Sequence, residues 1–467
     1  MEPLRGVRVL DLSRVVSGPL CTYYLAALGA EVIRVERPGG DVSWGPPPQI
    51  GPEGIHRGPR RPRDIGITPL RRHRGKRSVV LDLRRPGGLE ALHRLVARSD
   101  VLVENFTPGT LEALGLGDEV LGRLRPGIIR CSITGYGEEG PYRDRPSMDL
   151  VVQAVSGLMA KTGFPDGPPT KVGVTVGDQV PALFAALGVV AALRGRERDG
   201  SRESAGGQDG ARVLRVDVAM LDALLALIWD EPVDDYRDRG LPERFGNGDP
   251  RGVPLGTYAC RDGMVALLVV GDAQWQAMAG LLGRPELAAR LPTARDRLEH
   301  REEVEAAVAA WCAGRDRNEV VERLSAAGIP AGPVEPPWVG ATDPHVRARG
   351  SLEALRHPDL PEPTPYLGAR FPVRFGGRPP ETAPAEPLGA STEAVLREVA
   401  GLDEAALRAL REGGAIPAPE PEPPPAASRA AAEAGEEAAG RAGGSPGSGA
   451  PPGGPVATDP RRGARGR

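Results

Sequence analysis

One aspartate, in the segment KVGVTVGDQVPALFAAL (171–187), is the side chain of this sequence best suited to covalent chemistry. Asp178 follows a strand-like apolar run and opens a long apolar stretch with helical spacing, with Pro181 in its first turn, where a missing N–H costs little. An aspartate at a helix start usually caps the helix by accepting backbone N–H groups, which lowers its pKa. The helix N-terminus also favours anions, so it would help to hold anionic intermediates. A cap and a nucleophile are therefore compatible roles for Asp178.

Other kinds of catalytic site lack their motifs. No histidine has a neighbour at ligand spacing such as H-E-x-x-H, so we expect no metal site. No G-x-S-x-G elbow and no P-loop occur, which argues against a serine hydrolase and a nucleoside triphosphatase. A carboxylate-based site remains, with Asp178 as the leading candidate.

The composition indicates a large folded body with an added unfolded segment. The chain has 467 residues, with 63 glycines, 50 prolines and 40% apolar residues. The net charge of −3 favours neither a nucleic acid nor an anionic membrane as partner. Four scattered cysteines, no signal peptide and no apolar run of membrane-spanning length predict reduced thiols and a cytoplasmic location.

The first elements predict an α/β fold. A strand in GVRVLDLS, a helix in SGPLCTYYLAALGA and a strand in EVIRVE form a βαβ unit. The turn SRVVSGP lacks G-x-G-x-x-G, so we reject a nicotinamide dinucleotide site there. Further alternation of strands and helices predicts a Rossmann-like, mostly parallel sheet. The loops SGPL, ENFTPG and ITGYGEEGP then lie at the carboxyl ends of strands, where such sheets bind ligands.

Composition shifts along the chain predict its domains. A hairpin with Asp262-Gly263 at its turn, followed by helices, indicates a smaller α+β domain. We expect residues 43–77 to form a long surface loop, and 196–212 to form a polar loop. The expected organisation is a large domain at 1–212, a linker helix at 213–240, the small domain at 241–335, a return to the large domain at 336–416 and a disordered tail at 417–467.

Seven stretches in order resemble the family III CoA-transferases, of the CaiB/BaiF type, over residues 1–416. They are LRGVRVLDLSRVVSGPLCTYYLAALGAEVIRVERPGGD, RGKRSVVLDLRRPGG, VLVENFTPGTLEALGLG, IIRCSITGYGEEGPY, DLVVQAVSGLMAKTGFPDGPPTKVGVTVGD, DGMVALLVVGDAQWQAMAGLLGRPEL and SAAGIPAGPV. The resemblance implies two interlocked subunits, each with a large and a small domain. It also implies that coenzyme A enters as an acyl-CoA substrate and that no cofactor is permanently bound.

The resemblance places the nucleophile of the family on Asp178. It implies an aspartyl–acyl anhydride and then an aspartyl-CoA thioester, a covalent route that needs no metal and no histidine base. A glycine-rich cover over the site would fall on Gly246, Asn247 and Gly248 of RFGNGDP. An ordinary turn explains these three residues equally well.

CoA contacts carry over to several short motifs. Arg37 and Arg84 match positions that meet CoA phosphates, and an arginine can bind a phosphate through two hydrogen bonds. Formyl-CoA transferase has Gln and Ala where this chain has Val16 and Ser17, which argues against that substrate. The full set of expected CoA or acyl contacts is Val16, Ser17, Arg37, Leu81, Arg84, Asn105, Phe106, Thr107, Arg145, Met148 and Asp149.

Two alternatives to a CoA-transferase remain open, a racemase and a non-catalytic CoA-binding protein. The family's racemases have a histidine before the aspartate of SMDLVVQA, where this chain has Met148, which cannot carry a proton. A transferase is therefore favoured over a racemase, and retention of Asp178 argues against a non-catalytic CoA-binding protein. ITGYGEEGPY and WGPPPQIG resemble the branch that moves CoA between dicarboxylic acids. Arg145 and RRHRGKR (71–77) could meet carboxylates or CoA phosphates, although such charge runs are often solvated loops.

Overall fold

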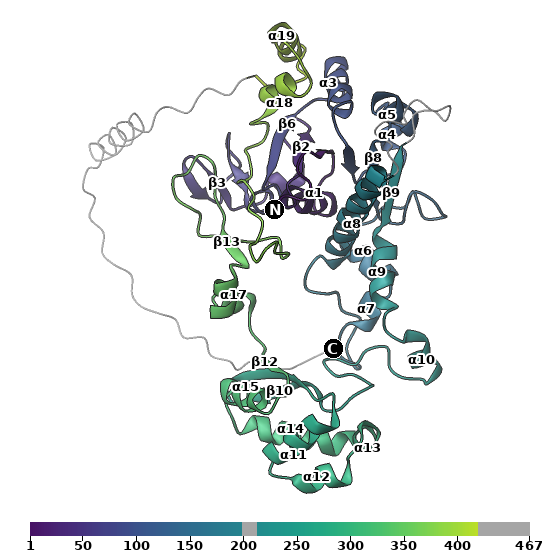
Figure 1. Cartoon of the computed structure of the whole chain (residues 1–467), viewed down its shortest axis with the longest axis vertical. Coiled ribbons are helices and arrows are strands. Elements are labelled where there is room, and N and C mark those ends of the chain that lie inside the picture. The colour runs from purple at the N-terminus through teal and green to yellow at the C-terminus, as the bar shows by residue number, and fades with distance from the viewer. Residues whose placement is uncertain (199–212, 419–467) are drawn as a thin grey trace, which may run out of the picture. The chain divides into compact units, whose positions relative to one another are not determined.

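Six parallel strands form the central sheet of the computed structural model, which describes residues 1–198 and 213–418 (Figure 1). In spatial order they are β6 (Lys76–Val80), β2 (Glu31–Glu36), β1 (Arg8–Asp11), β7 (Val101–Glu104), β8 (Ile129–Thr134) and β9 (Leu214–Ala219). Every pair of neighbours is parallel. The predicted α/β fold with a Rossmann-like parallel sheet is confirmed.

The strand order reverses between β1 and β7. The chain runs outward from β1 through β2 to β6, then crosses back to β7 and continues to β8 and β9. In a doubly wound sheet, ligands bind in the crevice outside the carboxyl ends of the strands on either side of such a reversal. The loops that follow β1 and β7 are therefore the first place to look for a site.

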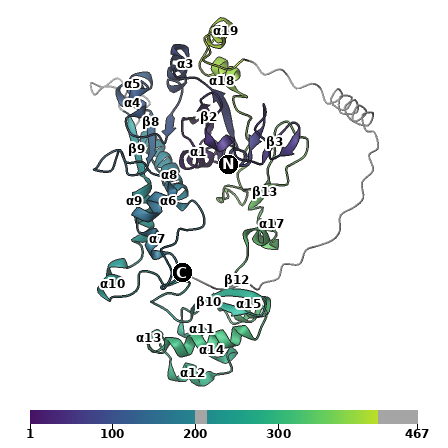
Figure 2. The same cartoon turned by 180° about the vertical axis from the view of Figure 1, so that it is seen from behind.

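Helices cover both faces of the sheet, as the alternation of its side chains requires (Figures 1 and 2). Leu10 and Leu102 pack in one core with α3 (Pro86–Val96), α18 (Thr392–Glu398) and α19 (Glu404–Glu412). Their neighbours Val9, Val101 and Val103 pack in a second core with α1 (Ser17–Ala27) and α8 (Val176–Arg198). Residues near the C-terminal end of the described chain thus complete the core of the first strands.

A second, antiparallel sheet has its own core. It contains β10 (Leu255–Cys260), β11 (Gly263–Leu268) and β12 (Ala331–Pro333). Trp275, Met278 and Trp311 lie in this core. The helices beside it are α11 (Asp272–Leu281), α12 (Pro285–Arg290), α13 (Ala294–Glu299), α14 (Arg301–Ala313) and α15 (Arg317–Ala326). The hairpin expected around Asp262 is present, with β10 paired to β11.

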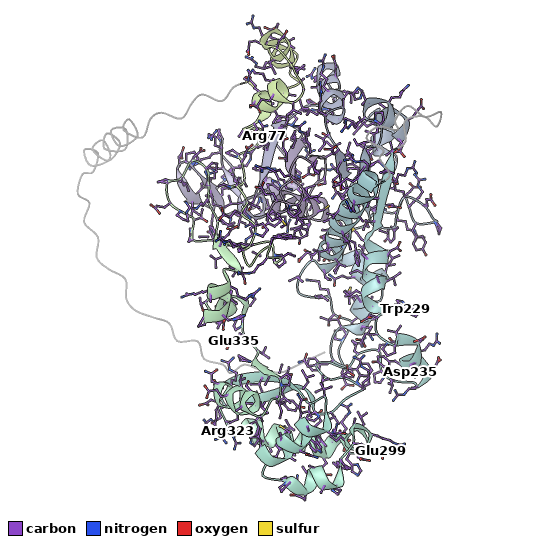
Figure 3. The ribbon with its side chains drawn as sticks, in the orientation of Figure 1. Arg77, Trp229, Asp235, Glu299, Arg323 and Glu335 are labelled. Carbon is purple, nitrogen blue, oxygen red and sulfur yellow. The ribbon has the colours of Figure 1, made fainter. Side chains whose placement is uncertain are left out.

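Short elements connect these parts. Trp229, labelled in Figure 3, follows α9 and is exposed. The connecting elements are α4 (Thr110–Ala113), α5 (Asp118–Leu124), α6 (Asp149–Val155), α7 (Leu158–Lys161), α9 (Met220–Ile228), α10 (Val233–Asp238), α16 (Pro337–Gly340), α17 (Pro344–Arg349), β13 (Leu352–Ala354) and β14 (Leu367–Ala369). Most of the predicted 417–467 tail and of the 196–212 loop lies outside the described residues.

The long surface loop predicted at 43–77 is wrong. The region holds a short 3-10 helix η1 (Val42–Trp44), helix α2 and three antiparallel strands, and Trp44, Ile50, Ile65 and Leu70 form a small buried core. The elements are β3 (Gln49–Gly51), β4 (Gly54–His56), β5 (Ile65–Gly66) and α2 (Ile67–Arg72). Leu355 and Ala385 from the returning C-terminal segment complete this core, and the spacing of its apolar residues in 43–77 shows no clear period.

The linker helix predicted at 213–240 is also wrong at its start. Residues 214–219 form β9, which pairs with β8 at the edge of the central sheet. The alternation of LRVDVA fits a strand with one face covered by α8, and the helix starts only at Met220. The sheet therefore extends beyond the boundary expected at residue 212.

Helix α8 corrects a further expectation. Among the described helices, only this one, over Val176–Glu197, is long and apolar enough to cross a membrane by length and composition. The expectation that no such stretch exists is wrong for this helix. Ala182, Ala185 and Val189 are buried against the sheet, and a core helix passes the same test of length and composition. This packing accounts for one face of α8, whereas Leu183, Phe184 and Leu187 are exposed.

A buried ion network joins the carboxyl ends of β1 and β2. Arg34, which is 1% exposed, forms ion pairs with Asp11 at 3.3 Å, Glu36 at 3.1 Å and Asp41 at 3.3 Å. Its Nη1 also donates to the Ser13 carbonyl at 2.9 Å. Because a buried charge needs partners on all sides, the loop after β1 and the loop after β2 are fixed to one guanidinium.

Lys76 from β6 enters the same network. Its Nζ lies 3.1 Å from Asp11 Oδ2 and 2.7 Å from the Thr22 hydroxyl. Burial raises the pKa of Asp11, but Lys76 and Arg34 outweigh burial and bring the pKa down to about 2. Burial lowers the pKa of Lys76 to about 8, with Asp11 acting in the opposite direction. Three strands thus meet at one carboxylate.

We expect Arg34→Met to lower the free energy of unfolding by about 3–5 kcal/mol, because it leaves buried carboxylates without a counter-charge. Urea denaturation at pH 7 measures this loss. Arg8→Met, which removes a half-exposed ion pair with Glu31 on the same sheet, should cost no more than about 1 kcal/mol. Equal losses in the two variants would contradict a special role for the Arg34 network.

Candidate functional site

The loops after β1 and β7 are joined at the point where the strand order reverses. The Asn105 side chain accepts the Arg14 backbone N–H at 2.7 Å and donates to the Arg14 carbonyl at 2.8 Å. Phe106 packs beneath the Arg14 guanidinium, 4.9 Å from the ring centre. One asparagine therefore sets the path of the first loop, just before Val16 and Ser17.

Val15 holds a left-handed backbone conformation within that loop. Its φ of 66° is rare for a β-branched residue and costs about 1–3 kcal/mol. Its N–H donates to Asp41 Oδ2 at 2.9 Å, and its carbonyl accepts Arg72 Nη1 at 2.9 Å. Gly18 is required next to it, since a Cβ there would lie 2.1 Å from Ser13 Cβ. The tight turn that presents Val16 and Ser17 is thus held from both sides.

A cavity of about 630 Å³ lies against these loops and contains Asp178 in its wall. Ten of the predicted site residues line it, although they come from five separate segments of the chain. They are Val16, Ser17, Arg37, Asn105, Phe106, Thr107, Arg145, Met148, Asp149 and Asp178. The structure thus places these ten side chains around one volume.

Asp178 lies in the first turn of α8 but does not cap it. The helix begins at Val176, and the carboxylate that accepts a backbone N–H at its start belongs to Asp149, which binds Gly177 N at 2.8 Å. Gln153 Nε2 holds the Asp149 carboxylate at 2.9 Å. Within the described ranges, no group donates a hydrogen bond to the Asp178 carboxylate. The predicted cap is wrong, and Pro181 lies inside the helix rather than in its first turn.

The backbone N–H groups of this first turn are all engaged. The N–H of Val176 donates to Val174, that of Gly177 to Asp149, and those of Asp178 and Gln179 to Thr175. The expectation that the start of α8 would hold anionic intermediates is therefore not met. Positive charge at this cavity comes instead from the side chains of Arg14, Arg37, Arg143 and Arg145.

The surroundings of Asp178 raise its pKa to about 6. Burial is the main cause, and the neighbouring Asp149 carboxylate adds to it, while Arg72 acts in the opposite direction. The predicted lowering of this pKa by a cap is wrong, because the hydrogen bonds that would lower it go to Asp149. Near pH 7 Asp178 is mostly ionised and half-buried, and it accepts no hydrogen bond from the described residues. Such a carboxylate is suited to act as a nucleophile.

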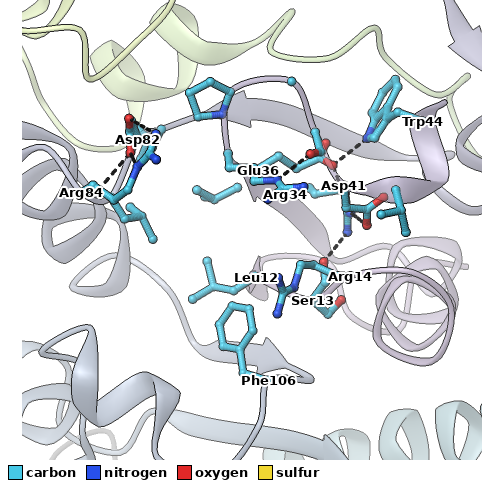
Figure 4. A pocket seen from close by; sticks show the side chains of 18 of the residues that line it. Leu12, Ser13, Arg14, Arg34, Glu36, Asp41, Trp44, Asp82, Arg84 and Phe106 are labelled. Carbon is cyan, nitrogen blue, oxygen red and sulfur yellow. Dashed lines mark hydrogen bonds and ion pairs between the residues drawn. The ribbon is translucent and has the colours of Figure 1, made fainter. Parts of the chain in front are cut away.

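A second cavity of about 780 Å³ adjoins the first (Figure 4). Arg14, Arg37, Asp41 and Phe106 line both cavities, so the two volumes share a wall. Leu81 and Arg84, also predicted from the sequence, line only the second. Arg84 is exposed and donates to Asp82 at 2.8 Å through two nitrogens, so an anion that binds Arg84 would share it with Asp82. Together the cavities can take a long ligand with anionic groups.

The predicted glycine-rich cover lies apart from the residues that line these cavities. The Gly246 N–H donates to the Gly163 carbonyl at 3.0 Å, and a Cβ on Gly246 would lie 2.6 Å from the Phe164 ring. Asn247 Nδ2 donates to the Thr257 hydroxyl at 2.9 Å. Neither Gly246, Asn247 nor Gly248 lines a cavity that contains Asp178. Their role as a cover stays a prediction.

Two residues that line both cavities, Arg14 and Asp41, were not predicted as site residues. Arg72, which holds the turn at Val15, was predicted only as part of a cationic run that could meet carboxylates or CoA phosphates. Arg72 belongs to the cationic run 71–77, where Arg74 and Lys76 are buried and paired. The run of like charges therefore contains both structural residues and residues at the site. Only the fold shows which is which. Among the described residues, no group of three or more His, Cys, Asp or Glu is arranged to hold a metal ion.

Comparison with known proteins shows that this chain is similar in sequence to CoA-transferases. The family model described as CoA-transferase family III matches residues 4–392. Succinyl-CoA–D-citramalate CoA-transferase of Chloroflexus aurantiacus is 37% identical over 370 residues, covering 77% of this chain and 85% of the relative. Succinyl-CoA:mesaconate CoA-transferase of Haloarcula marismortui is 35% identical over 410 residues, covering 86% and 98%. Formyl-CoA:oxalate CoA-transferase of Rhodopseudomonas palustris is 31% identical, covering 90% and 98%.

Solved structures agree with these similarities. A CAIB/BAIF family protein from Brucella suis superposes with a TM-score of 0.71 at 32% identity, covering 85% of this chain and 99% of that one. The protein Rv3272 of Mycobacterium tuberculosis gives a TM-score of 0.69 at 30% identity, covering 84% and 98%.

We expect Asp178→Asn to stabilise the protein at pH 7. The native pKa of about 6 exceeds the unfolded value near 4, so an ionised Asp178 destabilises the fold as pH rises from about 4 to 6. The gain should reach at most about 3 kcal/mol above pH 6 and shrink toward zero near pH 4. Urea denaturation across this pH range measures it, with the exposed Asp144→Asn as control. A gain that does not depend on pH would contradict the raised pKa.

Proposed function

The chain belongs to CoA-transferase family III, and from this membership we propose that it moves CoA from succinyl-CoA to a second carboxylic acid, with Asp178 as the nucleophile. One observation carries the choice of Asp178: it is an ionisable carboxylate with a raised pKa and no hydrogen-bond donor among the described residues, in the wall of a cavity that is also lined by four arginines. Succinyl-CoA is the donor in the names of several relatives, including the citramalate and mesaconate enzymes.

The first half of the reaction forms a covalent enzyme. The Asp178 carboxylate attacks the thioester carbonyl carbon, the C–S bond breaks, and CoA leaves as a thiolate. An aspartyl–succinyl anhydride results. The thiolate then attacks the Asp178 carbonyl carbon of this anhydride, and succinate leaves as a carboxylate. The product is an aspartyl-CoA thioester, and no proton changes place in either step.

The second half repeats these steps with the acceptor. The acceptor carboxylate attacks the aspartyl-CoA thioester, and the thiolate leaves again. The thiolate then attacks the acyl carbon of the acceptor, which frees the Asp178 carboxylate. Each attacking group is already an anion, so a general base is not needed. Arg14, Arg37 and Arg145 supply positive charge near the developing anions, and the half-buried wall limits access of water to the anhydride.

The two adjoining cavities fit the two ends of an acyl-CoA. We propose that the cavity with Asp178 takes the thioester and the cavity lined by Leu81 and Arg84 takes the nucleotide end. Arg37 lines both and can meet a phosphate between them. Phe106, beneath Arg14, forms part of their shared wall.

The racemase alternative needs a second acid–base group that is aligned with Asp178 across the substrate. Met148 lines the cavity, is 65% exposed and cannot carry a proton. Asp149 is held by Gly177 and Gln153, which leaves it as a structural acceptor. We therefore propose a transferase alone. Cytoplasmic location and assembly as an interlocked homodimer stay predictions.

We expect incubation with succinyl-CoA to leave CoA on the enzyme. Intact mass measurement should find a CoA-sized adduct, and peptide mapping should place it on the segment with Asp178. Asp178→Ala should show no adduct and lose at least about 1,000-fold in transfer rate, because Asp41 and Asp149, the other carboxylates in the cavity wall, are held by backbone N–H groups. Undiminished transfer in Asp178→Ala would exclude the mechanism.

The pH dependence of kcat/KM tests the environment of Asp178. We expect kcat/KM to fall about tenfold per pH unit below about pH 6, where the nucleophile becomes protonated. Asp149→Asn removes a neighbouring negative charge, so the midpoint should move to lower pH. Asp144→Asn, an exposed carboxylate on the loop that leads to α6, should leave the midpoint in place. A midpoint that Asp149→Asn leaves unchanged would contradict the coupling of the two carboxylates.

A further inference from the structure

A third cavity, of about 640 Å³, lies beside the start of α8 and is lined by many arginines. Gln179, the residue directly after Asp178, is part of its wall, together with the apolar side chains of Leu20 and Phe371. The arginines come from the end of α2, from α17 and from the segment around β14. They are Arg71, Arg72, Arg74, Arg349, Arg370 and Arg374.

The positive charge of this arginine cavity is only partly balanced. Glu353 forms ion pairs with Arg74 and with Arg370, the latter at 2.9 Å. Across residues 1–198 and 213–418, no carboxylate lies within ion-pair distance of the other four arginines. Several unpaired cations around one hollow favour an anion inside it, because each guanidinium gains from a nearby negative charge.

Arg72 links this cavity to Asp178. Its Nη1 donates to the carbonyl of Val15, which lines the cavity of Asp178, while Arg72 itself lines the arginine cavity. Its Nε and Nη2 donate to no group in the described part of the chain. Arg72 also counteracts the rise in the pKa of Asp178, as a positive charge in the neighbourhood of that carboxylate does. A carboxylate bound to Arg72 would therefore lie close to the nucleophile.

We propose that Arg72, in the wall of the arginine cavity, binds the second carboxylate of a dicarboxylic substrate, the one that does not exchange CoA. The inference rests on the proposed transfer of CoA at Asp178. Gln179, the residue after Asp178, lines the arginine cavity, so a dicarboxylate at the start of α8 would present one end to Asp178 and the other to Arg72. Gln179 offers an amide donor beside the same carboxylate.

A comparison of donors separates this role from two others. Arg72→Gln should lower kcat/KM about 10- to 100-fold with succinyl-CoA and less than about threefold with butyryl-CoA, which has the same chain length without the second carboxylate. If the cavity instead takes a CoA phosphate, KM rises equally for both donors. If Arg72 only holds the Val15 turn, kcat falls equally for both. Either equal loss overturns the proposal.

Two further variants keep the test independent of the Val15 turn. Arg374→Gln removes a cation of the cavity that does not contact this turn, and it should also lower kcat/KM for succinyl-CoA more than for butyryl-CoA. Arg347→Gln, on the same short helix as Arg349 but outside the cavity, should change neither. Arg72→Lys should recover part of the loss, since it restores the charge without the second hydrogen bond.

Calorimetric binding of the free acids distinguishes failure of this inference from failure of the proposed function. Wild-type enzyme should bind glutarate at least about tenfold more tightly than butyrate, and Arg72→Gln should remove that preference. Equal binding of the two acids by the wild type overturns the inference even if CoA transfer occurs. Preferential glutarate binding without any transfer would refute the proposed function and leave the dicarboxylate site standing.

Discussion

The buried guanidinium of Arg34 is the constraint on which the site depends. It has Asp11, Glu36 and Asp41 as ionic partners in the interior. Asp41 uses the same carboxylate to hold the N–H of Val15. Because the Arg34 guanidinium is almost completely buried, its carboxylate partners must stay close to it to balance its charge. The strained turn that leads to Val16 and Ser17 is thus fixed by an ion network in the core of the sheet.

Asp178, the proposed nucleophile, lies in the first turn of α8 without capping it. The cap contact goes to Asp149, and so Asp178 keeps its lone pairs free. Burial beside a second carboxylate raises the pKa of Asp178. The carboxylate is therefore more basic, and its ionised form destabilises the folded state. An active site often carries such a cost, because the group that must react cannot also be fully satisfied by its neighbours.

Arginine has three different tasks in this protein. Arg34 is a buried structural cation, whereas Arg14 and Arg37 line the two adjoining cavities. Arg72 contributes to both structure and site, with one nitrogen on the Val15 carbonyl and others without a protein partner in the described chain. The positive charges at the cavities match membership of CoA-transferase family III, since coenzyme A and its exchange partners are anions.

The sequence by itself determined the parallel α/β sheet, the βαβ start and the hairpin at Asp262, and it singled out Asp178 as the candidate nucleophile, because periodicity and the order of motifs are local properties. It misassigned 43–77, whose small core of Trp44 and Ile65 has no periodic signal. Only the tertiary structure decided that Asp149, not Asp178, caps α8, and that Arg72 acts on the pKa of Asp178 while Lys76, four residues later, is buried and paired with Asp11. Those roles depend on contacts between residues far apart in the chain, and pairing and burial of charges are set by such contacts.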